Sequence, residues 1–187
     1  MALSKIDAAN FLTGTIPSGN IATSSLAAAA TGKVLQVKNA AATTKQSSSS
    51  TSFADVSGLS VSITPASSSN KILVVVNCNM LSNAGGSACF VKLLRDSTVV
   101  TKTTTSGANA TAEVYASGGG QTSGADRYNT NPAISFLDSP SSTSALTYKI
   151  QFATSNASNA AYINGWALND DQSGVSTITV MEIAAWL

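Results

Sequence analysis

KILVVVNCNM, residues 71–80, contains five consecutive apolar residues, Ile72 to Val76, followed by Asn77 and Asn79 at alternate positions. Valine and isoleucine favour strands, and a continuous apolar run predicts a strand that is buried on both faces. The two asparagines indicate that one of these faces becomes polar further along. The stretch therefore predicts a central strand of a β-fold.

A glycine-containing turn follows this strand, and Cys89 to Arg95 reads as the returning strand of a hairpin. The register that keeps one face apolar pairs Val76 with Val91 and Cys78 with Cys89. Residues paired in this way have β-carbons about 4.5–5.5 Å apart. Both a disulfide and a buried pair of thiols fit this arrangement. The thiol pair is favoured, because free cysteine is a small buried hydrophobe and cytoplasmic thiols stay reduced.

Further strands are expected along the chain, most of them short and separated by turn-forming residues. Leu146, Tyr148, Ile150 and Phe152 alternate with polar residues, as in a half-buried strand. The other expected strands span residues 33–37, 59–64, 98–101, 112–116, 133–137, 162–168 and 176–186, the last with both faces apolar, and loops are expected over 38–52 and from 118 to about 131. Such spacing predicts an all-β fold, an antiparallel, jelly-roll-like β-sandwich spanning residues 32–187.

Residues 1–31 have a different pattern. Glycine and proline in the stretch 12–21 are too closely spaced for a helix or a central strand. Apolar side chains recur about every five positions and cannot form a core of their own. Either the segment is a loose tail or, as we favour, it is an extended anchor and oligomerisation arm that docks through these residues: Ile6, Phe11, Leu12, Ile16, Ile21 and Leu26.

The composition favours an assembled protein. Charged residues make up 10% of the 187 residues and the net charge is +1, whereas soluble domains usually have roughly 25% charged residues. A surface with so little charge repels neighbouring copies weakly. The charge balance gives no electrostatic signature of nucleic-acid or membrane binding. The first residues do not read as a secretory signal, so synthesis in a cytoplasm is expected.

The search for catalytic motifs argues against an enzyme. The chain has no histidine, which removes Ser-His-Asp and Cys-His pairs and histidine metal sites. Most of the nine carboxylates lie in expected turns, although a pair that meets in space, as in glycoside hydrolases, stays open. The stretch 169–171 reads as a turn rather than a calcium loop. No catalytic residue, metal or cofactor is therefore predicted.

One loop is a candidate for contact with a partner. Gly118, Gly119 and Gly120 are followed by polar residues up to Arg127 and Tyr128. Glycines and polar side chains do not fill a core, so this backbone is expected to reach water or another chain. Arg127 and Tyr128 are the predicted exposed contacts.

The order of several segments resembles a region common in virion structural proteins of bacteriophages, marine phages especially. The segments are GKVLQV (32–37), TSFADV (51–56), LSVSITP (59–65), SNKILV (69–74), LRDS (94–97), FLDSP (136–140), TYKIQ (147–151) and STITVMEI (176–183). LTGTIP (12–17) is similar to the repeated connector segments of phage tail fibres.

This resemblance implies a trimeric fibre or decoration protein on the phage particle, with no catalytic residues. The chain lacks a long shaft, so a short fibre, a knob or a capsid-decorating cement protein fits better than a full tail fibre. The expected partners are two further copies of the chain and capsid, neck or tail proteins of the virion. The alternative is a receptor-binding head whose loops recognise host surface glycans.

Overall fold

The computed structural model describes residues 33–82, 87–100, 116–119, 129–165 and 174–185. The predicted docking residues of segment 1–31 lie outside them. The chain divides into two units, Met1–Lys33 and Val34–Leu187, and the described strands belong to the second. None of the described residues forms a helix, so none of them forms a helix able to span a membrane.

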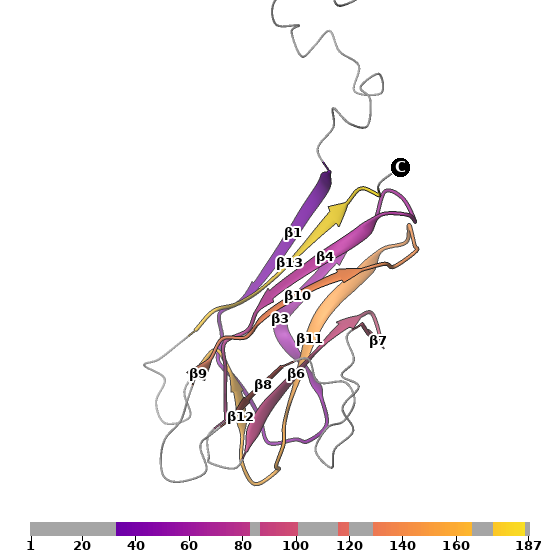
Figure 1. Cartoon of the computed structure of the whole chain (residues 1–187). Helices are drawn as coiled ribbons and strands as arrows, with labels where there is room; N and C mark the ends of the chain where they lie inside the picture. Colours follow the sequence, from indigo (N-terminus) through magenta and orange to yellow (C-terminus); the bar gives the residue numbers. More distant parts are fainter. Residues whose placement is uncertain (1–32, 83–86, 101–115, 120–128, 166–173, 186–187) are drawn as a thin grey trace, which may run out of the picture. The chain divides into compact units, whose positions relative to one another are not determined.

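The strands make three antiparallel sheets (Figure 1). The front sheet has the order β1 (Val34–Ala42), β13 (Ser176–Ile183), β4 (Lys71–Asn77), β10 (Ala133–Asp138). The back sheet has the order β3 (Ala54–Ile63), β11 (Leu146–Thr154), β6 (Ala88–Arg95), β7 (Thr98–Val99), and β8 (Ala116–Gly119) also pairs with β6. A smaller end sheet has the order β2 (Gln46–Ser48), β12 (Ala161–Ile163), β5 (Met80–Ser82), β9 (Asn129–Thr130).

The path of the chain between the two large sheets is that of a jelly roll. β1 lies in the front sheet, β3 in the back, β4 in the front, and β6, β7 and β8 in the back. The chain then returns to the front with β10, to the back with β11 and to the front with β13. This alternation wraps two Greek keys into a sandwich. The predicted antiparallel, jelly-roll-like sandwich is therefore confirmed.

Alternate residues of the strands fill the space between the large sheets. On β4, Ile72, Val74 and Val76 are fully buried, while Leu73 and Val75 on its other face are only partly buried. Each fully buried aliphatic side chain contributes roughly 1.5–3 kcal/mol by leaving water. The largest fully buried side chains include Tyr148, Leu59, Ile63, Leu93, Ile134, Ile150 and Ile178.

An ionic contact ties the two large sheets together. Arg95 of β6 pairs with Asp138 of β10 at 2.5 Å, and the hydroxyl of Tyr148 on β11 donates to the same carboxylate oxygen at 2.7 Å. Burial first, and then the hydrogen bond to Asp138, raises the pKa of Tyr148, so its phenol stays protonated and remains a donor. The contact fixes the edge strand β10 against the back sheet.

Asn164 joins the end sheet to the front sheet. Its backbone has a φ of 58°, a left-handed conformation that asparagine tolerates better than most residues. Its side-chain amide donates to the carbonyl of Ala42 at 2.7 Å, and its side-chain oxygen accepts from the hydroxyl of Ser176 at 2.6 Å. The Ser176 hydroxyl in turn accepts from the backbone amide of Asn79 at 2.9 Å. Both the amide nitrogen and the oxygen of the Asn164 side chain are therefore hydrogen-bonded in this buried junction.

Glu182 of β13 is a fully buried carboxylate held by neutral donors. It accepts hydrogen bonds from the side chains of Gln36 and Asn70, both at 2.6 Å, and from the backbone amide of Ala66 at 2.7 Å. Burial acts to raise the pKa of Glu182, but these bonds and one from the Ser67 amide outweigh it and hold the pKa below its ordinary value of 4.5. The carboxylate therefore links β1, β13 and the turn after β3.

The predicted hairpin between residues 71–80 and 89–95 is wrong. β4 pairs with β13 and β10 in the front sheet, whereas β6 pairs with β11, β7 and β8 in the back sheet. The chain leaves the front sheet after Asn77, forms β5 in the end sheet and only then enters β6. Cys78 and Cys89 consequently do not face each other across a hairpin.

Both cysteines are nevertheless buried free thiols in the core, as favoured from the sequence. Burial raises the pKa of Cys78 to about 11 and raises that of Cys89 further. A thiol that stays protonated at neutral pH is a poor nucleophile. The two cysteines act as small core hydrophobes.

Several predicted boundaries also differ from the structure. The expected loop 38–52 contains the second half of β1 and all of β2, and the expected loop after residue 118 contains the end of β8 and β9. Of the predicted strand 162–168, the first two residues belong to β12, which ends where Asn164 adopts its left-handed backbone, and residues 166–168 lie outside the described residues. Strand 112–116 lies outside the described residues, apart from residue 116, where β8 begins. The missed strands share a cause, because polar Ser, Thr, Asn and Gly also occupy strands at sheet edges, where no apolar alternation marks them.

We predict that Glu182→Gln destabilises the fold by about 1–3 kcal/mol, because an amide nitrogen would face donors in place of one carboxylate oxygen. The folded-state pKa is lowered, so the contribution of the ionised carboxylate is fully present above pH 4.5, its ordinary value, and is lost as the pH falls through the folded-state pKa. Urea unfolding of the unmutated protein and of Glu182→Gln, at pH 7 and below pH 4, measures the difference between their free energies of unfolding. This difference should be smaller in acid, and an unchanged difference would contradict this role for the carboxylate.

We predict that Cys89→Ala costs roughly 1 kcal/mol, as for trimming a small buried side chain. Reductant should leave the unfolding free energy of the unmutated protein unchanged. A thiol-reactive dye should label the folded protein slowly and the urea-unfolded protein at once. Rapid labelling of the folded protein would show that these thiols are accessible.

Candidate assembly interface

The outer face of the front sheet carries a row of apolar side chains that crosses all four strands. Val37 of β1 pairs with Met181 of β13, Met181 pairs with Leu73 of β4, and Leu73 pairs with Leu137 of β10. Positions paired across neighbouring strands lie on the same face of a sheet. Val37 and Leu137, at the two edges, are 54% and 55% exposed, and Met181 and Leu73 between them are partly buried.

More apolar surface adjoins this row at the end where β1 begins. Val34, which pairs with Ile183 of β13, is exposed, and so is Leu35, the extra residue of a β-bulge between Val34 and Gln36. A bulge bends the strand locally and redirects its side chains. The apolar row and these residues (Val37, Met181, Leu73, Leu137, Val34, Leu35 and Ile183) are called the apolar face below.

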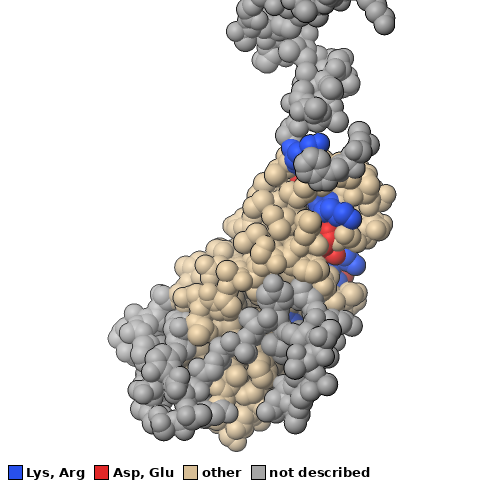
Figure 2. All heavy atoms as spheres, viewed as in Figure 1, with Lys and Arg blue, Asp and Glu red and all other residues tan. Residues whose placement is uncertain are grey.

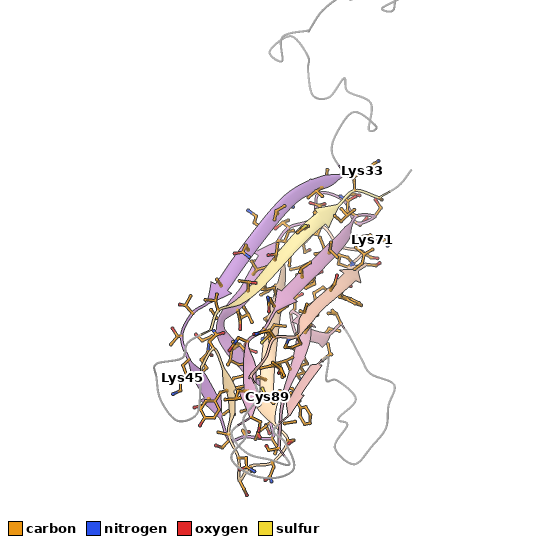
Figure 3. The ribbon with its side chains drawn as sticks, turned by 60° about the vertical axis from the view of Figure 1, so that its left-hand side comes forward. Lys33, Lys45, Lys71 and Cys89 are labelled. Carbon is orange, nitrogen blue, oxygen red and sulfur yellow. The ribbon has the colours of Figure 1, made fainter. Side chains whose placement is uncertain are left out.

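Charge is almost excluded from this side of the molecule. Among the described outward positions of the front-sheet strands, Lys71 at the end of β4 is the one charged residue. Lys38 of the edge strand β1 pairs with the buried Val180, so it starts from the inner side of the sheet, but it is exposed at the edge. The next row across the sheet is Asn39, Thr179, Val75 and Ser135. In Figure 2, atoms of charged residues gather near one end and along one margin, and the surface over β1 and β13 is largely without them. Figure 3 places Lys33 and Lys71 at that same end.

The outer face of the back sheet has the opposite character. Lys149 of β11 forms an ion pair with Asp55 of β3 at 2.9 Å, and Gln151 donates to the same carboxylate at 2.6 Å. Hydrogen bonds from Lys149 and then Gln151 lower the pKa of Asp55. The ammonium of Lys92 lies 4.4 Å from the ring centre of Phe53. This face suits water, whereas the apolar face suits a partner.

A shallow groove of about 550 Å³ lies on the back sheet beside β7. Its lining includes Lys92, Lys149 and Asp96. Lys149 is already paired with Asp55, and Asp96 accepts a hydrogen bond from the backbone amide of Thr147 at 2.9 Å. These charges serve contacts within the chain. Within the described residues, no three His, Cys, Asp or Glu side chains gather into a metal-binding cluster.

The residues predicted as contacts from the sequence lie outside the described residues: Ile6, Phe11, Leu12, Ile16, Ile21 and Leu26, as well as Arg127 and Tyr128. The apolar face is a further candidate surface, made by strands that were assigned to the fold alone.

The sequence did contain a signal for the apolar face. Residues 72–76 are apolar without interruption, and this predicted a strand buried on both faces. Among the described residues, a layer covers only the inner face of β4, and Leu73 and Val75 on its outer face stay partly open. β13 also has apolar residues on both faces, with Ile178 and Val180 buried and Met181 and Ile183 partly buried on the outer side, although Thr179 and Glu182 interrupt the run. A strand that is apolar on both faces therefore marks, in a two-layer sandwich, an outer face that the described residues leave uncovered.

Comparison with known proteins adds no family assignment. No family model matches the chain. No curated protein matches it either.

Proposed function

We propose that this protein is a non-enzymatic structural protein of a bacteriophage virion. In this proposal it forms a homotrimeric short fibre, knob or capsid-decorating protein, and residues 1–31 dock on capsid, neck or tail proteins. The observation that carries the proposal is the apolar face, a nearly uncharged sheet surface opposite a charged one. The order of phage-like segments supplies the virion context.

The hydrophobic effect favours a partner that covers the apolar face. Monomeric proteins rarely expose contiguous apolar patches larger than roughly a few hundred Å², and patches above that size mark interaction sites. Burying Leu73, Val37 and Leu137 in an interface would recover the hydrophobic free energy that a lone chain loses. Copies of the chain do not repel one another strongly, because the net charge is +1. The jelly roll is also a fold of viral capsid domains, an analogy at the level of the fold that agrees with the proposal.

We predict that the full-length chain sediments as a trimer at micromolar concentration and that Leu137→Asp sediments as a monomer. Leu137 is 55% exposed, so the substitution should leave the strand spectrum of the head intact while placing a charge in the interface. Ser60→Asp, on the exposed side of the back-sheet strand β3, is the matched control and should stay trimeric. An unmutated chain that sediments as a monomer would refute the proposed assembly.

A second prediction concerns the segment before the head. Deleting residues 2–31 should leave the head folded, because the unit Val34–Leu187 contains the whole of the described core. The deletion should abolish incorporation into phage particles, measured as the copy number per purified virion after complementation. Normal occupancy of the truncated protein would show that the anchor lies elsewhere.

A further inference from the structure

We infer that three copies assemble with their front sheets turned towards a common three-fold axis, so that the β1 edge of each copy packs against the β10 edge of the next. The inference rests on the proposed function, since it assumes that the partner is the chain itself. It specifies the surface, the symmetry and the residue pair at each contact, Val37 of one copy and Leu137 of its neighbour.

The choice of partner follows from the match between surfaces. The apolar face is nearly free of charge and therefore fits an apolar, nearly uncharged surface. The outer face of the back sheet carries Lys92, Lys149 and Asp55 and would leave charges without water if it covered the apolar face. Of the two outer faces of the sandwich, only the outer face of the front sheet matches the apolar face of another copy.

The width of the front sheet selects the number of copies. Four strands spaced about 4.8 Å apart make a face roughly 19 Å wide. Three such faces enclose an axis at a distance of about 5.5 Å from each sheet, close to half of the roughly 10 Å that separates packed sheets. Four copies would set each sheet about 9.5 Å from the axis and leave a channel lined by apolar side chains. With three copies, Met181 and Leu73 fill the axis and no channel remains.

The apolar side chains at the two ends of the row favour a trimer over a dimer of stacked sheets. Two sheets stacked face to face would place the centre of the row in the core of the interface and its two ends at the rim, which is usually polar. Here the ends, Val37 and Leu137, are the most exposed apolar members of the row. Around a three-fold axis these ends are the corners where neighbouring copies meet. The contact is then head-to-tail, and a head-to-tail contact that closes makes a ring.

The test uses cysteine pairs and a short thiol-to-thiol cross-linker on the full-length chain. The natural thiols of Cys78 and Cys89 are fully buried and should not react in the folded protein. The double variant Val37→Cys with Leu137→Cys should give covalent dimers and trimers on a denaturing gel and nothing larger. Each single variant should stay uncross-linked, because the proposed contact joins unlike positions. The control pair Ser60→Cys with Leu137→Cys should also stay uncross-linked.

Other outcomes have distinct meanings. If the unmutated chain is a trimer by sedimentation but Val37→Cys alone cross-links, like positions meet and the head-to-tail arrangement is wrong, while the proposed function stands. Cross-linking of the double variant that stops at a dimer would indicate a stacked pair and overturn the inference. A trimer in which the double variant does not cross-link would place the contact elsewhere on the chain. A monomeric unmutated chain would remove the basis of both the proposed function and the inference.

Discussion

A strand has two faces, and the central strand β4 is apolar on both. Its inner face, with Ile72, Val74 and Val76, is sealed by the back sheet and forms the centre of the core. Its outer face, with Leu73 and Val75, is left partly open by the described part of the chain. A two-layer sandwich can bury only one side of each sheet, so a doubly apolar strand requires a further layer. The fold and the proposed assembly follow from the same short segment.

Polar contacts decide where each strand is placed, since apolar burial alone does not fix a register. Asp138 holds β10 to the back sheet through Arg95 and Tyr148, and Asn164 holds the end sheet to the front sheet. Glu182 holds the beginning of β1 to β13. Each of these side chains is buried with its hydrogen-bond partners close by. Removing one partner would leave a buried polar group unpaired, which costs more than the bond contributes when intact.

The sequence predicted the class of fold well and its connections poorly. Apolar alternation marked β11, and a continuous apolar run marked β4, because both patterns depend only on which sides of a strand meet apolar neighbours. The hairpin between β4 and β6 was wrong because consecutive strands usually pair, whereas a jelly roll sends them to opposite sheets. The edge strands β2 and β9 were missed because their short polar residues show no alternation. The apolar face was missed because the apolar run that contains Leu73 was taken to be buried on both faces, although the described residues provide no layer on its outer side.

The carboxylate of Glu182 has a mechanical consequence. β1 is an edge strand that begins directly after residue 33, and it is bonded antiparallel to β13 from Val34 to Ala42. If residues 1–31 hold the protein to a particle, a pull on the head enters the fold at the beginning of β1. For the component of the pull that is parallel to β1, the backbone bonds to β13 bear the load together in shear and do not open one at a time. The hydrogen bond between Gln36 and Glu182 lies close to where the force enters and would be among the first to bear it. Because this bond is made to an ionised carboxylate, the attachment should resist force best at neutral pH and weaken when acid protonates Glu182.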